Sequence, residues 1–133
     1  MMMIKYISAF FSNKKFFLNN FGNHVRDFTY VDDVVKILLL LLKNNKKIKN
    51  FEVLNVCSNN PVKLSKIIRI MKINKITPKI KKTSLQMADI IKTHGDNKKI
   101  LKITKFKKFS PIEVSIKKTI MWYKDYFLKK NYN

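Results

Sequence analysis

The sequence has a single cysteine, and this scarcity excludes two kinds of small protein. Cys57 has no second cysteine with which to form an internal disulfide, so a disulfide-stapled secreted fold is excluded. No group of cysteine and histidine residues has the spacing of a structural metal site. We therefore expect a cytoplasmic protein, kept in a reducing compartment, that binds no metal.

Long hydrophobic runs are also lacking. The longest, "VVKILLLLL" at residues 34–42, includes a lysine and falls far short of the roughly 20 apolar residues that span a bilayer. The start, "MMMIKYISAFF", has no basic segment before its apolar run and no small-residue cleavage site, as a signal peptide would have. We expect a helix there and no membrane association.

Acidic residues and arginine are scarce, whereas lysine is abundant. Eight acidic residues face 29 basic ones, which gives a net charge of +21, and only two of the 29 are arginines. Such a charge is typical of nucleic-acid binders. Here the lysines are spread through every segment beside many Asn, Ile and Phe, all of which have A/T-rich codons. We favour compositional drift and do not expect nucleic acid as a partner; a selected polyanion-binding surface stays the alternative.

The length of 133 residues and the apolar fraction of 46% suit one small folded domain. Apolar spacing and turn residues predict alternating helices and strands, which is typical of an α/β fold. The expected elements are a helix at 2–12, a strand at 14–22 ending in a turn at Gly22, a strand at 26–31, a helix to about Lys43, a polar loop at 44–50, a strand at 51–58, a turn and helix at 59–71, an extended stretch at 76–93, a short helix at 97–103 and a last helix at 110–130.

Several polar residues are suited to helix starts. We expect Asp32 or Asp33 to cap the helix that runs to Lys43, and Asp96 to cap the short helix. The string "SPIE" at residues 110–113 has the form of a capping box with proline at the first helical position. We assign Asp27 to a strand end as well, and none of these acids to catalysis.

Four strings occur in the order and spacing of a known family: "RDFTYVDDVV", "FEVLNVCSNNPVKLSKII", "LQMADIIKTHGDNKKI" and "MWYKDYF". With them the chain resembles, over nearly its whole length, the C-terminal part of NAD-dependent nucleotide-sugar epimerases and dehydratases. These are extended short-chain dehydrogenases, and the strings are most similar to those of UDP-glucuronate 4-epimerases. Four strings in order form a strong signal, although each alone is a moderate one.

The resemblance implies a fold that is only part of the family's. Family members have a Rossmann domain for NAD, followed by a smaller domain that holds the nucleotide sugar. Residues 1–133 would form that second, nucleotide-sugar-binding region, with the Rossmann cofactor domain missing. Residues 31–58 would return to the absent Rossmann sheet. "MMMIKY" would match an internal position of relatives, so the gene would be decayed, split or mis-started.

The cofactor chemistry of the family needs parts that the sequence lacks. Backbone amides reach the dinucleotide pyrophosphate through a glycine-rich turn from strand to helix, and the only glycines are Gly22 and Gly95. The family also uses a tyrosine base with a lysine four residues on. Tyr126 and Lys130 have this spacing, but a lysine-rich sequence gives it by chance and the family keeps no chemistry on its last helix. We expect no catalytic residue here, and NAD only in the complete family enzyme.

The resemblance does imply substrate-binding residues. In the family the arginine of "RDFTYVDD", here Arg26, contacts the pyrophosphate, and a guanidinium presents a fork of donors that lysine lacks. "LQMAD" is similar to the family's Gln-Pro-Gly-Asp loop, so Gln86 and Asp89 would face the phosphate and the ribose. Met87 and Ala88 replace the turn-forming Pro-Gly pair.

"KKFFLNN" matches the segment whose main chain meets the uracil in relatives, so Phe16 and Leu18 would act through backbone groups. The alternatives stay open: Arg26 could be a surface arginine kept by chance, and "LQMAD" could be an ordinary polar loop. His24 and His94 have no partner motif, and we expect them to be loop residues. The aromatic residues of the last helix are expected to pack against apolar surface.

These expectations lead to three hypotheses on function. The first is a truncated UDP-sugar epimerase that binds a UDP-sugar weakly and is inactive alone. The second is a small basic module that binds nucleic acid or another polyanion. The third is a subunit that completes a split epimerase with a separate Rossmann-domain chain; a homodimer is also open.

Overall fold

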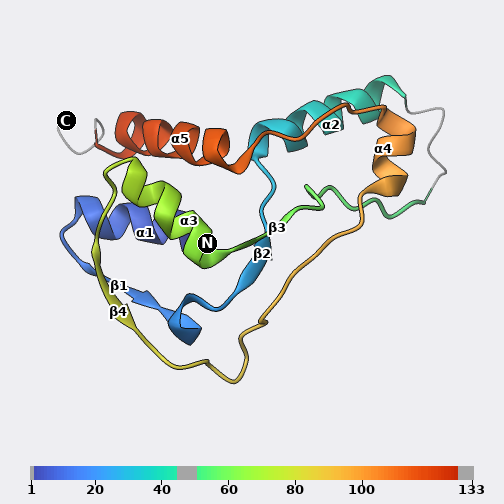
Figure 1. The fold of residues 1–133 in the computed structure, drawn as a ribbon. Helices are drawn as coiled ribbons and strands as arrows, with labels where there is room; N and C mark the ends of the chain where they lie inside the picture. The colour runs from blue at the N-terminus through green and yellow to red at the C-terminus, as the bar shows by residue number, and fades with distance from the viewer. Residues whose placement is uncertain (1, 45–50, 129–133) are drawn as a thin grey trace.

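The computed structural model describes residues 2–44 and 51–128 (Figure 1). Helices and short strands alternate along these residues, so the expected mixed α/β class is confirmed. The elements are α1 Met2–Phe11, β1 Lys15–Leu18, β2 Val25–Asp27, α2 Val31–Lys43, β3 Pro61–Lys63, α3 Leu64–Ile73, β4 Lys79–Lys82, α4 Lys98–Thr104 and α5 Ile112–Tyr123. A π-helical turn, Lys124–Leu128, follows α5 directly.

The strands of the described residues form two separate two-stranded sheets. β1 pairs with β4 in parallel, with Phe16 opposite Ile80. β2 pairs with β3 in antiparallel, with Arg26 opposite Val62, and an isolated parallel bridge joins Val25 to Lys92 on the loop after β4. The two sheets therefore bring the first thirty residues against segments far along the chain.

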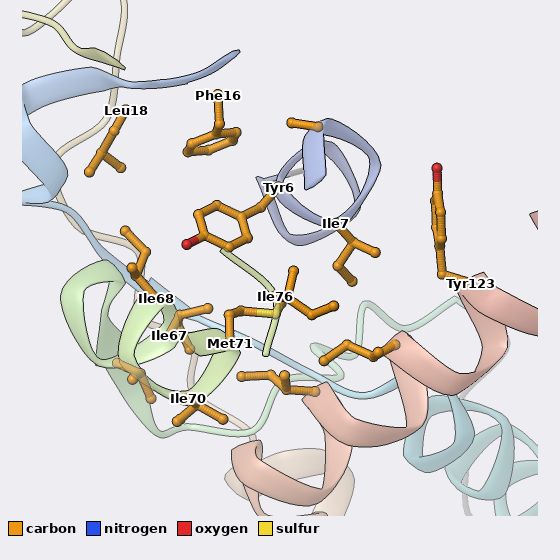
Figure 2. Close-up of a cluster of buried hydrophobic side chains, with 14 residues drawn as sticks. Tyr6, Ile7, Phe16, Leu18, Ile67, Ile68, Ile70, Met71, Ile76 and Tyr123 are labelled. Carbon is orange, nitrogen blue, oxygen red and sulfur yellow. The ribbon is translucent and has the colours of Figure 1, made fainter. Parts of the chain in front are cut away.

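The hydrophobic core lies between α1, β1, α3 and α5. Apolar side chains recur at helical spacing on each helix, so one face of each turns inward. Figure 2 shows Tyr6 lying between Phe16 of β1 and Met71 of α3. The Tyr6 and Phe16 rings meet edge to face with centroids 5.0 Å apart, and Tyr6, Ile7 and Met71 are fully buried.

α2 packs against α4 at the end of the molecule away from α1 and β1 (Figure 1). Ile37 of α2 and Ile100 of α4 are fully buried there. The rest of the apolar surface of α2 is largely uncovered. Its exposed apolar side chains are Val31, Val35, Leu38, Leu39 and Leu42. None of the described helices combines the length and apolar content that crossing a membrane requires.

Two expected strands differ from the structure. The strand predicted at 51–58 is wrong: the described segment 51–58 forms no strand, and Phe51 and Val53 are exposed. A strand exists through ladder hydrogen bonds to a neighbouring strand, and no described strand pairs with this segment. The strand predicted at 26–31 is shorter, since β2 ends at Asp27. Residues 45–50 of the predicted loop at 44–50, and Lys130, lie outside the described residues.

The predicted caps of two helices are also wrong. α2 begins at Val31 after Tyr30, so Asp32 and Asp33 lie inside its first turn, and no side chain caps it. Ser110 does not cap α5 either, because its hydroxyl donates to Asp33. In both cases a contact between distant segments replaces the local one. Asp96, in contrast, does accept a first-turn amide of α4, from Lys98 at 2.8 Å.

Candidate functional site

A groove of about 520 Å³ opens where α1, β1 and β2 meet the loop after β4. Its walls combine aromatic side chains with charges of both signs. The lining residues are Met2, Lys5, Phe16, Phe17, Leu18, Asn19, His24, Arg26, Asp27, Phe28, Leu64 and Asp89. Four of the five predicted site residues, Arg26, Asp89, Phe16 and Leu18, therefore share one groove.

Arg26 is held by three contacts within the chain. Its Nη1 donates to the carbonyl oxygens of Val25 and Ile91, each at 3.0 Å, and its Nη2 lies 3.4 Å from Asp89 Oδ1. A guanidinium has five N–H donors, so these contacts use three. Among the described residues nothing accepts from Nε or from the second Nη2 hydrogen. The Nε hydrogen and one Nη2 hydrogen thus remain as donors.

Asp89 follows a tight turn. Its amide donates to the Gln86 carbonyl at 3.0 Å, which closes the turn although Met87 and Ala88 stand where the family has Pro-Gly. Neither of the two central residues has a positive φ, so this turn does not need glycine. The Asp89 side chain keeps 27% of its surface exposed, so part of the carboxylate faces the groove.

Gln86 is the predicted site residue that the structure leaves apart. Its side chain is exposed and is not among the groove lining. Phe16 and Leu18 direct their side chains into the core (Figure 2), so they could act on a ligand only through main-chain groups, and the Leu18 carbonyl already accepts the Thr83 amide at 3.0 Å. β1 pairs with β4 along one edge and has no strand partner on the other within the described part of the chain. That edge leaves main-chain groups available.

Asp27 fixes the loops behind the groove. Its carboxylate accepts the Ser58 hydroxyl at 2.5 Å and the amides of Asn59 and Gly95, each at 3.1 Å. The Asp27 amide itself donates to Thr93 Oγ1 at 3.1 Å. Because these bonds occupy both carboxylate oxygens, Asp27 acts as an anchor at the strand end and not as a base.

Cys57 lies next to this anchor. Burial, and then the nearby Asp27 carboxylate, raise the pKa of the Cys57 thiol above its ordinary value. The thiol therefore stays protonated at neutral pH and is not an activated nucleophile. Gly95 packs closely on it, since a Cβ at Gly95 would lie 2.4 Å from the Cys57 sulfur.

His24 lies in the groove wall, although the sequence predicted an ordinary loop residue. It is 2% exposed, and its Nε2 is 3.2 Å from Asp89 Oδ2, within ion-pair distance but outside hydrogen-bond geometry. No local motif links these two positions, because only the bridge between Val25 and Lys92 brings their segments together. The sequence therefore carried no signal for this contact.

The described residues do not fit the pyrophosphate of NAD. Gly22 lies in a 3-10 turn with φ of +85° beside Leu18, and the Gly95 amide is already bonded to Asp27. Neither glycine stands between a strand and the helix it leads into, as the dinucleotide cradle requires. Nor do three or more potential metal ligands cluster anywhere in residues 2–44 and 51–128.

Comparison with known proteins points to one family over part of the chain. The model of the NAD dependent epimerase/dehydratase family matches residues 1–57. The chain is therefore similar to part of this family. Protein CapI of Staphylococcus aureus is 27% identical, over 97% of this chain and 43% of its own length. The UDP-glucuronate 4-epimerase of Thermodesulfobacterium geofontis is 28% identical, over 94% of this chain and 38% of its own length.

The fold also agrees with solved structures of nucleotide-sugar epimerases. UDP-glucuronic acid 4-epimerase from Bacillus cereus, solved with UDP-glucuronic acid and NAD, superposes with a TM-score of 0.81 at 20% identity. The match covers 94% of this chain and 40% of that one. The chain thus has a partial, C-terminal portion of the extended short-chain dehydrogenase fold, and spans about 40% of the length of the relatives it matches.

Proposed function

We propose that the groove between Arg26 and Asp89 holds the UDP part of a nucleotide sugar. The chain would be the nucleotide-sugar-binding part of an NAD-dependent epimerase that resembles UDP-glucuronate 4-epimerase. The observation that carries this proposal is the placement of one guanidinium and one carboxylate, 3.4 Å apart, in one groove. A nucleoside diphosphate presents a phosphate and a ribose side by side, so it matches such a pair.

Arg26 binds the pyrophosphate in this proposal. Two of its five donors remain in the plane of the guanidinium, and such donors suit the oxygens of a phosphate. The Val25 and Ile91 carbonyls hold the guanidinium in place, so little side-chain entropy is lost when the phosphate binds. Lysine has a single flexible ammonium and could not replace this geometry.

Asp89 accepts the ribose hydroxyls, because a carboxylate oxygen pair can receive two O–H donors. The uracil lies along the free edge of β1, where main-chain groups near Phe16 and Leu18 meet it. Gln86 supports the site through its carbonyl, which closes the turn before Asp89. A UDP-sugar bound this way is held weakly, since the groove covers one side of the ligand only.

Turnover requires a second part that supplies NAD and the tyrosine base. Residues 31–58 would lie against the Rossmann sheet of that part. An apolar groove of about 630 Å³, lined by Phe28, Tyr30, Val31 and Trp122 among others, lies at the start of this segment. We place the protein in the cytoplasm, where Cys57 stays reduced.

Titration of the chain with UDP tests the proposal. Arg26→Ala removes a charge-assisted pair of hydrogen bonds, worth about 1.5–3 kcal/mol, so the Kd for UDP should rise about 10- to 150-fold. Arg26→Lys should recover only part of this loss. The matched control is Arg69→Ala, because Arg69 is the other arginine, is exposed and lines a different depression on α3.

Two further results bear on the alternatives. If Arg26→Ala and Arg69→Ala weaken UDP binding equally, Arg26 acts only as one positive charge among many. That result would favour a polyanion-binding surface, whose affinity for arbitrary DNA falls steeply with salt. Epimerisation of UDP-glucuronate by the pure 133-residue chain would show that the chain needs no second part.

A further inference from the structure

His24 is a buried polar group with an unusual environment. It precedes β2, its carbonyl accepts the Leu64 amide at 2.9 Å, and its side chain is 3% exposed. The Nε2 atom is buried and makes no hydrogen bond to any described residue. A buried imidazole nitrogen without a partner costs free energy, so such an atom is rare unless it has a use.

The nearest group to this nitrogen is the Asp89 carboxylate. Its two oxygens are divided between two neighbours: Oδ1 lies 3.4 Å from Arg26 Nη2, and Oδ2 lies 3.2 Å from His24 Nε2. The other charged groups that line the groove are Lys5 and Asp27, and Asp27 is occupied by its own hydrogen bonds. His24 and Arg26 therefore flank the Asp89 carboxylate, one beside each oxygen.

Apolar packing does little to hold Asp89 in place. The side chains on either side of it in the loop, Met87, Ile90 and Ile91, are exposed by 107%, 64% and 55%. The loop is fixed by main-chain bonds between Val25 and residues 91 and 93, and by the contacts of Asp89 itself. Where the carboxylate lies thus depends on polar neighbours.

We propose that His24 is a positioning residue for nucleotide binding: through a proton on Nε2 it orients the Asp89 carboxylate toward the ribose. This inference rests on the proposed function. Asp89 can only accept, so the contact requires the proton on Nε2. His24 Nε2 and Asp89 Oδ2 are 3.2 Å apart, so a small shift of the loop would align them in hydrogen-bond geometry. An oriented carboxylate then loses little entropy when it accepts the ribose hydroxyls.

The test compares two ligands, UDP and inorganic pyrophosphate, and three variants of the full chain. His24→Phe keeps a ring but removes the donor, so the Kd for UDP should rise about tenfold, the loss of one hydrogen bond to a charged group. Pyrophosphate binding, which needs only Arg26, should not change. His24→Gln supplies an amide donor and should restore most of the UDP affinity. Arg26→Ala should weaken both ligands.

The imidazole nitrogen NMR signals give a second readout. In the unchanged chain the Nε2 signal of His24 should be that of a protonated nitrogen and should move when UDP, but not pyrophosphate, is added. If His24→Phe binds UDP as tightly as the unchanged chain, or if His24→Gln weakens UDP as much as His24→Phe does, the positioning role is overturned while the proposed function stands. If the unchanged chain binds no UDP, both the positioning role of His24 and the proposed function are contradicted.

Discussion

Asp33 receives two hydrogen bonds from Ser110, one from its amide at 2.7 Å and one from its hydroxyl at 2.9 Å. Asp33 is 2% exposed and lies in the first turn of α2, whereas Ser110 lies two residues before the start of α5. One carboxylate thereby links the starts of two helices that are far apart in sequence. We infer that this link fixes how α2 lies relative to α5.

Loss of this carboxylate should be costly. Asp33→Ala leaves two donors of Ser110 without an acceptor in a part-buried place, so the free energy of unfolding should fall by about 2–3 kcal/mol. Asp33→Asn keeps one acceptor and should lose about half as much. Urea unfolding of the variants measures both values.

The matched control is the neighbouring acid. The Asp32 side chain is 48% exposed and pairs with Lys118 at 3.5 Å, so Asp32→Ala should change the free energy of unfolding by less than about 0.5 kcal/mol. If Asp32→Ala and Asp33→Ala cost the same, the contact with Ser110 does not stabilise the fold.

Removal of the Tyr6 hydroxyl should stabilise the chain. The ring is fully buried between α1, β1 and α3, and its hydroxyl has no hydrogen-bond partner among the described residues. Such an unsatisfied group costs about 1–3 kcal/mol, so Tyr6→Phe should raise the midpoint of urea unfolding. A lower midpoint would mean that the hydroxyl has a partner, such as a buried water.

The uncovered face of α2 should cause association that grows with salt. Leu38 and Leu42 are 50% and 73% exposed on this face, and contiguous apolar surface favours contact with another chain. The net charge of +21 opposes association at low ionic strength and is screened at about 0.5 M salt. Sedimentation velocity should show a monomer at low salt and larger species at high salt.

A charge on this face tests its part in association. Leu42→Lys should delay association to higher salt, whereas Thr77→Lys adds the same charge at an exposed site after α3 and should delay it much less. A Rossmann-domain partner, if it covers α2, should suppress association altogether. A monomer at every salt concentration would contradict an α2 face that needs cover.

The sequence predicted the parts of the fold that depend on local spacing. Helical periodicity at residues 2–12 indicated α1, and the apolar pattern after Leu64 indicated α3. Local sequence patterns gave wrong predictions where a residue far along the chain accepts a hydrogen bond that was expected to stay within one helix. Ser110 was expected to cap its own helix, but its hydroxyl and its amide both donate hydrogen bonds to Asp33. Nothing in the string "SPIE" indicates this distant acceptor.

The site was predicted in part for the same reason. Arg26 and Asp89 came from family strings, and the structure places them 3.4 Å apart. His24 belongs to none of the family strings, and it lies near Asp89 because β2 bridges to the loop after β4. The apolar segment at 51–58 predicted a strand, but a strand also needs a neighbour, which one segment cannot specify.

The contact map of UDP tests the central claim most directly. Backbone amide signals of the full chain are followed by NMR while UDP is added at constant, low salt. If the groove holds the nucleotide, the largest shifts should fall on Arg26, Asp89 and the β1 residues Phe16 and Leu18, with little change on α4. Shifts spread evenly over exposed lysines, or centred on Lys63, Lys66 and Arg69, would contradict the claim.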